Sequence, residues 1–176
     1  PLLISADRWE RLRWPKRERV RGRDRGDPRP ATVPVLLDSG AFSVLDRCGC
    51  WPTTPQQYVT FVRRAIAVLG PGAVKHVATQ DWMCEPGMLA KTGLSVHEHQ
   101  RRTVESFLRL RELAPEVPWM PTLQGYTVDD YLRCIEMFIA AGVDLAAEAL
   151  VGLGSVCRRS STPELVAVIC AVLRAV

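Results

Sequence analysis

Short apolar segments alternate with amphipathic segments along this chain, and this alternation restricts its fold more than any other feature. The segments that read as strands are residues 2–5, 33–38, 74–79, 119–123 and 144–151. Apolar residues recur at the three- and four-residue spacing of a half-buried helix in the segments between and after them. These expected helices are residues 55–69, 95–113, 127–141 and 162–176. Strands that alternate with helices in this way predict a parallel α/β fold.

Two parallel architectures fit this pattern. A complete (β/α)8 barrel takes about 250 residues, whereas this chain has 176. The pattern therefore predicts an incomplete (β/α)8 TIM-type barrel, with about five parallel strands and their helices, truncated at the C-terminus. Residues 1–176 would then form a single partial barrel domain. An open doubly wound sheet is the alternative, and the length of the chain favours it.

Polar residues at the ends of successive strands favour the barrel. Asp38 ends the second strand and is followed by Ser39 and Gly40, which allow a tight turn. Asp81, Gln124 and residues 152–155 occupy the corresponding places after the later strands. Because the carboxyl ends of parallel strands meet at the ligand-binding face of a barrel, we expect these residues to lie together there.

Each of these residues also has a purely structural interpretation. Asp38 can cap the turn that follows its strand, and Asp81 can cap a helix. Gln124 can be a solvated loop amide, Gly152 a turn residue and Phe42 an ordinary core residue. Their shared position at strand ends indicates a site, and no residue taken alone does so.

Residues 8–30 form a basic, arginine-rich insertion or loop. Ten basic residues stand against four acidic ones between positions 8 and 29, a local charge of +6. Because the whole chain carries +4, the remaining residues sum to −2. Such a run is typical of a solvated surface, but Trp9 and Trp14 among the guanidinium groups also suit contact with nucleic-acid phosphates and bases.

The six cysteines are scattered through the expected strands, helices and loops, so we expect reduced thiols. Cys48 and Cys50 are the only close pair, and no second Cys or His pair stands at zinc spacing, so no metal site is predicted. No apolar run approaches the roughly 20 residues that cross a bilayer. We therefore expect a cytoplasmic protein with no membrane partner.

Several motifs of the chain resemble one known family. They are D-S-G-A-F at 38–42, Q-D-W-M-C-E-P at 80–86, K-T-G-L-S-V-H-E-H-Q-R-R-T-V at 91–104, L-Q-G at 123–125, A-G-V-D-L at 141–145 and V-G-L-G-S-V-C-R-R at 151–159. Together they resemble the tRNA-guanine transglycosylase superfamily, and more closely its DNA-directed branch, the deazapurine-in-DNA protein A type. The resemblance implies an irregular (β/α)8 barrel that exchanges guanine in a nucleic acid for a 7-deazaguanine such as preQ0.

The resemblance also implies roles for individual residues. Asp38 matches an acid beside the exchanged base that assists proton transfer, and Phe42 matches the aromatic residue that stacks on the base. Asp81 matches the acid that pairs with the ring N–H and amino groups, whereas Gln124 and Gly152 match the groups that contact the carbonyl oxygen. The remaining predicted base-site residues are Ser39, Gly40, Gly125 and Gly154. Arg158 and Arg159 are predicted to contact phosphates at the rim of the pocket.

The chain departs from the family pattern in two ways. Ala41 replaces the second glycine of the Asp-Ser-Gly-Gly motif, which would slightly tighten the base pocket. The family's nucleophilic aspartate and its zinc-binding segment lie beyond Val176, so we expect a fragment that lacks the nucleophile, is inactive alone and binds no metal or cofactor. The expected partners are a 7-deazaguanine base, DNA or tRNA with DNA favoured, and partner proteins or a missing C-terminal segment.

Two other functional interpretations remain open at this stage. One is a noncatalytic module that binds a deazapurine or a nucleic acid. The other is an unrelated α/β metabolic enzyme, which would bind a sugar phosphate and ignore purines.

Overall fold

The computed structural model describes residues 2–5, 34–70, 72–157, 159 and 161–176. The predicted basic segment, residues 8–30, and the predicted phosphate contact Arg158 lie outside these residues. A parallel sheet contains four strands in chain order: β1 (Leu2–Ser5), β2 (Val35–Asp38), β3 (Val74–Ala78) and β4 (Trp119–Met120). Their register pairs Ser5 with Asp38 and Ala78 with Met120, so the carboxyl ends of neighbouring strands share one edge.

A single extended segment, residues 119–123, links this sheet to a second strand pair. After β4, Pro121 interrupts the pairing because it has no N–H to donate. Strand β5 (Thr122–Leu123) then pairs in parallel with β6 (Gly152–Leu153), and the Gly152 N–H donates to the Pro121 carbonyl over 2.8 Å. The prediction of an α/β fold with parallel strands is confirmed, whereas the strands of the described segments do not close into a barrel.

The four predicted long helices form close to their expected positions. They are α3 (Pro55–Leu69), α5 (Val96–Leu113), α6 (Val128–Ala140) and α7 (Thr162–Ala175). Thr54, Ser95 and Thr127 cap the first three as predicted, since each side chain accepts an N–H from the first helical turn. Ser161, one residue before the predicted Thr162, caps the last.

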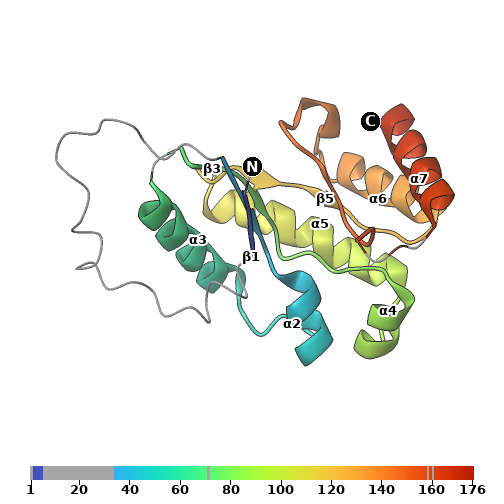
Figure 1. Cartoon of the computed structure of the whole chain (residues 1–176), viewed down its shortest axis with the longest axis horizontal. Coiled ribbons are helices and arrows are strands. Elements are labelled where there is room, and N and C mark those ends of the chain that lie inside the picture. The colour runs from blue at the N-terminus through green and yellow to red at the C-terminus, as the bar shows by residue number, and fades with distance from the viewer. Residues whose placement is uncertain (1, 6–33, 71, 158, 160) are drawn as a thin grey trace.

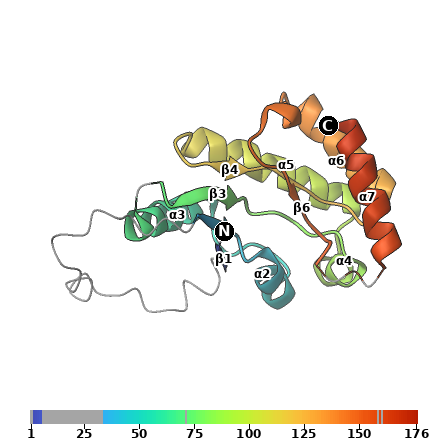
Figure 2. The ribbon, with the colours of Figure 1, turned by 45° about the horizontal axis from the view of Figure 1, so that its top comes forward.

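The long helices pack side by side in chain order, α3 against α5, α5 against α6 and α6 against α7, along the strands (Figures 1 and 2). The main core lies between these helices and the strands. Its fully buried members include Leu37, Val62, Val77, Phe107, Leu123 and Phe138. The edge of Phe107 meets the ring of Phe138 with centroids 5.6 Å apart, which joins α5 to α6. No helix in the described part of the chain is long and apolar enough to cross a membrane.

Two short helices that the sequence pattern did not predict lie beyond the carboxyl ends of the strands. They are α2 (Ala41–Cys48) and α4 (Pro86–Thr92), which lie against one another (Figure 1). A small second core fixes them through Leu45, Trp82 and Met88. These helices therefore build one wall of the strand-end face.

The predicted strand at residues 144–151 is wrong. Asp144 accepts the N–H groups of Ala146 and Ala147 at 3.1 and 3.3 Å, and these bonds fold Leu145–Ala147 into the 3-10 helix η2. An aspartate that bonds to the backbone two and three residues ahead competes with strand pairing. The strand at this point is only β6, which begins at Gly152.

Candidate functional site

Three of the predicted site residues meet at the carboxyl ends of the strands. The Ser39 hydroxyl donates to one oxygen of the Asp81 carboxylate over 2.9 Å. The Gln124 amide nitrogen donates to the other oxygen over 2.5 Å. All three side chains are buried, although they follow β2, β3 and β5. The expectation that these strand-end residues lie together is confirmed.

Ser155 and Glu85 extend this network. Ser155 was expected at the strand-end face as part of residues 152–155 but was given no role in the site, and Glu85 was not predicted. The Ser155 hydroxyl lies 2.8 Å from Gln124 Oε1 and 3.2 Å from Glu85 Oε2, and it accepts the Cys84 N–H over 2.8 Å. Its one proton can serve only one of these two acceptors at a time. Ser155 has a left-handed backbone, with φ of 56°, which is uncommon outside glycine and marks a constrained position. The place of Ser155 directly after the glycines at 152 and 154 was the signal in the sequence.

Asp38 sits above a tight turn at the end of β2. Gly40 adopts a left-handed conformation, with φ of 75°, and its N–H donates to Asp38 Oδ2 over 3.2 Å. The Ala41 N–H donates to the Ser39 hydroxyl oxygen over 3.2 Å. Asp38 therefore caps its own turn and also stands at the strand-end face, so its two sequence interpretations are compatible.

The two aspartates have perturbed acidities. Burial, together with the negative charge of Asp38, raises the pKa of Asp81 to about 6, although Ser39 and Gln124 donate hydrogen bonds that oppose the shift. Burial also raises the pKa of Asp38, against hydrogen bonds from the Gly40 and Ser39 backbone and the Ser5 side chain. Two neighbouring carboxyl groups with raised pKa values are typical of sites that bind or transfer protons.

The glycines around Gln124 stand where neighbouring atoms leave no room for a Cβ atom. A Cβ atom at Gly154 would lie 2.1 Å from Gln124 Nε2, and one at Gly125 would lie 2.8 Å from the Tyr131 nitrogen. The Gly154 N–H donates to Leu123 O over 2.9 Å, and its carbonyl accepts the Tyr131 hydroxyl over 2.7 Å. A Cβ at Gly152 would lie 2.9 Å from Met120 Cε. These glycines let the β6 segment pack directly against the amide, and their contacts with a base stay a prediction.

A cavity of about 550 Å³ opens beside the network. Phe42 from α2, Glu85 and Met88 from the α4 region, Tyr126 and Arg159 line it. The Arg159 guanidinium lies 4.6 Å from the Tyr126 ring centroid, and its Nε donates to the Ser155 carbonyl over 3.1 Å. Phe42 and Arg159 are thus brought to the same cavity, and their contacts with base and phosphate stay predictions.

The described residues contain no group of three or more His, Cys, Asp or Glu side chains placed to hold a metal ion. The six cysteines are free thiols; Cys84 and Cys134 are buried, and the other four are exposed. Burial raises the pKa of the Cys84 thiol well above its usual range, although it lies near the site. The buried Cys84 thiol is therefore held in its neutral form, which is the less reactive form of the group.

The family model described as DpdA, DeoxyPurine in DNA protein A, matches residues 10–176, a range that includes Asp38, Asp81, Gln124 and Ser155. No curated protein matches the chain.

Proposed function

The chain belongs to the DpdA (DeoxyPurine in DNA protein A) family, and we propose that its strand-end site exchanges guanine in DNA for a 7-deazaguanine such as preQ0. One observation carries this proposal. The buried Asp81 carboxylate is held between a hydroxyl and an amide at the ends of three strands. A buried carboxylate next to an amide is a natural partner for the polar edge of a guanine-like base.

The chemistry of that edge matches the side chains. A carboxylate can accept both the ring N–H and the amino group, while an amide nitrogen donates to the carbonyl oxygen. In the structure, Ser39 and Gln124 occupy the two carboxylate oxygens. An entering base would replace these two donors with its own, and Gln124 would turn its nitrogen to the base carbonyl. The number of hydrogen bonds to Asp81 is thereby preserved, which limits the cost of exchange.

The cavity beside the network offers room for the base rings. Phe42 presents an aromatic ring from α2, and Tyr126 adds a second one from the loop before α6. A cavity of about 550 Å³ lies within the range of small-molecule sites. We place the base between the Asp81 carboxylate and the Phe42 ring, with stacking on Phe42.

Asp38 is proposed as the group that moves a proton to or from the base. Its raised pKa brings its protonation closer to neutral pH, as proton transfer requires. Asp81 is committed to holding the base, and we assign no nucleophile among the described residues. A module that binds the base without exchanging it is the alternative proposal.

The wider architecture supports the same proposal. Parallel strands that follow chain order from β1 to β6, with helices packed in the same order, fit consecutive units of a (β/α)8 barrel. We also propose that residues 8–29 and the pair Arg158 and Arg159 contact DNA phosphates. Deleting residues 8–29 should lower the slope of log affinity against log salt by roughly 0.7 to 0.9 for each phosphate that the segment neutralises.

Two measurements test the proposal in sequence. Titration calorimetry with preQ0, with adenine as the control, asks whether the site binds a guanine-like base. Incorporation of labelled preQ0 into guanine-containing DNA, compared with tRNA, asks whether bound base is exchanged and into which polymer. Binding of preQ0 without incorporation, including in a chain extended at its C-terminus, would favour the noncatalytic module. Absence of preQ0 binding would refute the proposed site.

A further inference from the structure

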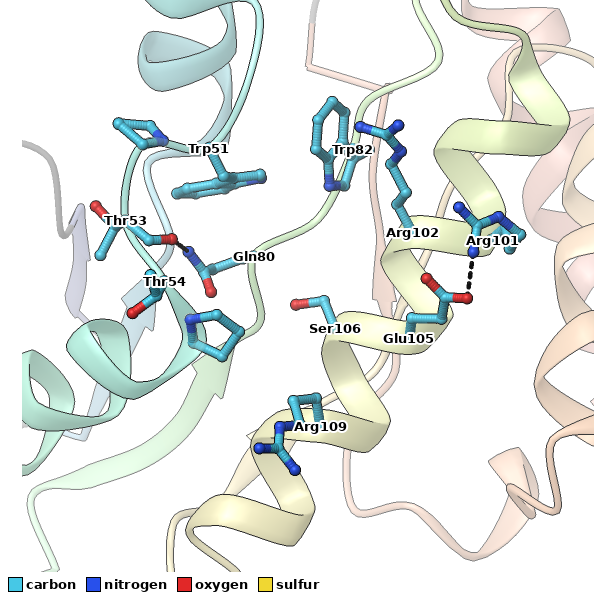
Figure 3. A pocket seen from close by; sticks show the side chains of 12 residues that line it. Trp51, Thr53, Thr54, Gln80, Trp82, Arg101, Arg102, Glu105, Ser106 and Arg109 are labelled. Atoms are coloured by element: carbon cyan, nitrogen blue, oxygen red, sulfur yellow. Dashed lines mark hydrogen bonds and ion pairs between the residues drawn. The ribbon is translucent and has the colours of Figure 1, made fainter.

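A second concave surface lies behind the strand-end site. This groove, of about 480 Å³, runs between the segment before α3 and the outer face of α5 (Figure 3). The aromatic and polar side chains on its walls include Trp51, Gln80, Trp82, Arg101, Ser106 and Arg109. None of the base-site residues lines it.

The groove and the base site share one stretch of backbone. Gln80 and Trp82 line the groove, whereas Asp81 between them bonds to Ser39 and Gln124 on the other side. The chain bends at Gln80, where the Asp81 N–H donates to the Thr79 carbonyl over 2.9 Å. The Trp51 indole N–H also donates to the Asp81 carbonyl over 3.2 Å. A ligand in the groove would therefore lie next to the backbone of the residue whose carboxylate we propose holds the base.

The charged residues that line the groove favour an anion. They are three arginines, Arg101, Arg102 and Arg109, and one acid, Glu105. Arg102 lies 4.6 Å from the Trp82 ring centroid, and Figure 3 shows its guanidinium beside that indole. This contact fixes one positive charge against an aromatic wall.

The ion pairs of these arginines do not block an anion. Arg101 and Arg102 each pair with Glu98 over 2.7 Å, and Arg101 also pairs with Glu105. Arg109 pairs with Glu112 over 2.5 Å. The Arg101 and Arg109 side chains keep 44% and 46% of their surface exposed. Ion pairs this exposed contribute little, so a phosphate can compete for their remaining donors. The Ser106 hydroxyl is buried, has no hydrogen-bond partner among the described residues and supplies a further polar group in the same wall.

We propose that this groove binds an unpaired DNA nucleotide that flanks the exchanged one, with its base stacked on Trp51 and its phosphate at Arg101 and Arg109. The inference rests on the proposed function, because a buried site can act on guanine in DNA only after the nucleotide leaves the base stack. Flanking bases then lose a stacking partner. Proteins that bind single-stranded nucleic acids stack the bases on aromatic rings and contact the phosphates with basic side chains, and this groove contains both kinds of group.

The arginines give the first test. The affinity of the whole chain for a short single-stranded deoxyoligonucleotide is measured by fluorescence anisotropy over a range of salt concentrations. The double variant Arg101→Gln, Arg109→Gln should bind about fivefold more weakly or worse, with a salt slope lower by about 0.7, since the two arginines share one phosphate and each single-strand phosphate contact contributes about 0.7. Arg111→Gln is the matched control, because Arg111 lies on the same helix, is ion-paired with Glu148 and is half exposed, but does not line the groove.

The indole gives the second test. Trp51→Leu removes the stacking surface and should weaken binding roughly tenfold, whereas Trp51→Phe keeps a ring and should retain most of the affinity. Because both variants lose the hydrogen bond to the Asp81 carbonyl, a difference between them reports stacking and not the position of the loop. Equal affinities for Leu, Phe and wild type, with the arginine double variant equal to Arg111→Gln, would overturn the proposal.

Calorimetry with preQ0 separates this inference from the proposed function. The arginine double variant should bind preQ0 as the wild type does, since neither arginine touches the base site. If wild type did not bind preQ0 while the groove variants still bound DNA more weakly, the proposed base site would be refuted and the proposed groove would be supported. If preQ0 bound normally and the groove variants kept full DNA affinity, only the proposal that the groove binds DNA would be refuted.

Discussion

The Gln124 amide nitrogen donates to the Asp81 carboxylate over 2.5 Å, although the two residues are 43 positions apart in the sequence. This bond joins the ends of neighbouring strand segments and buries both side chains. Ser39 and Ser155 complete a line of donors and acceptors from β2 to β6. Burying these polar groups costs little free energy only when each of them has its hydrogen-bond partners. A substitution that removes one partner should therefore lower the free energy of unfolding by a measurable amount.

Asp81→Asn should weaken preQ0 binding by about 1.5 to 3 kcal/mol, because a charge-assisted pair becomes partly mismatched. The new amide also presents a donor to the donor of Gln124. Titration calorimetry measures the change directly. Asp129→Asn, an exposed acid in the first turn of α6, is the control and should bind preQ0 as the wild type does. Equal affinity in the Asp81 variant would remove this residue from the site.

Gly154→Ala should disrupt the site without touching any charged group. The added Cβ would lie 2.1 Å from Gln124 Nε2, so the amide must leave the Asp81 carboxylate or the backbone must shift. We expect a loss of roughly 1 to 3 kcal/mol in the free energy of unfolding, as in other overpacked positions. Urea denaturation measures this loss.

Gly87→Ala is the matched control for this prediction. Gly87 lies in α4, and a Cβ there meets nothing within 4 Å. The substitution should be neutral or stabilise the chain by up to about 1 kcal/mol, because alanine favours the helix. Similar losses for the two alanine variants would mean that the clash at Gly154 is relieved without cost.

The long helices and most strands were predictable because their signals are local. Thr54, Ser95 and Thr127 mark helix starts in the sequence, and apolar spacing gives the buried face. The error at residues 144–151 has the opposite cause. There an apolar run suggested a strand, but the Asp144 carboxylate folds the backbone into η2, and a single side chain outweighs the pattern.

The meeting of the three central residues of the candidate site could be predicted, but the contacts of the residues around them could not. Strand-end position was enough to bring Ser39, Asp81 and Gln124 together. Glu85 and Ser155, 70 residues apart, meet only because α4 and the β6 loop fold over the same strand ends. Trp51 is similar, since only the folded chain places its indole against the Asp81 carbonyl.

The cysteines should divide into two reactivity classes. Cys48, Cys50, Cys157 and Cys170 are exposed, whereas Cys84 and Cys134 are buried, and burial raises the thiol pKa of both. A thiol reagent such as Ellman's should therefore modify four groups quickly in the native chain, and the other two only after denaturation. Fast reaction of all six would show that the core around Cys84 and Cys134 opens easily.

The stability of the chain should depend on pH through Asp81. Its pKa is about 6 in the folded chain, against 3.8 for an ordinary aspartate, so the folded state binds more protons than the unfolded state between these values. The contribution of Asp81 to the free energy of unfolding therefore falls as pH rises from about 4 to about 6, and then levels off. At about 1.4 kcal/mol for each pKa unit, the change is roughly 3 kcal/mol.

Urea denaturation of wild type and Asp81→Asn between pH 4 and 7.5 isolates this contribution. The asparagine side chain does not titrate, so the stability of the variant relative to wild type should increase by roughly 2 to 2.5 kcal/mol as pH rises through this range. Glu98, whose pKa is lowered to about 2 by Arg101 and Arg102, acts in the opposite direction, but it is present in both proteins and cancels in the difference. Parallel pH profiles for the two proteins would mean that the Asp81 carboxyl has an ordinary pKa, and that its burial is compensated by the donors of Ser39 and Gln124.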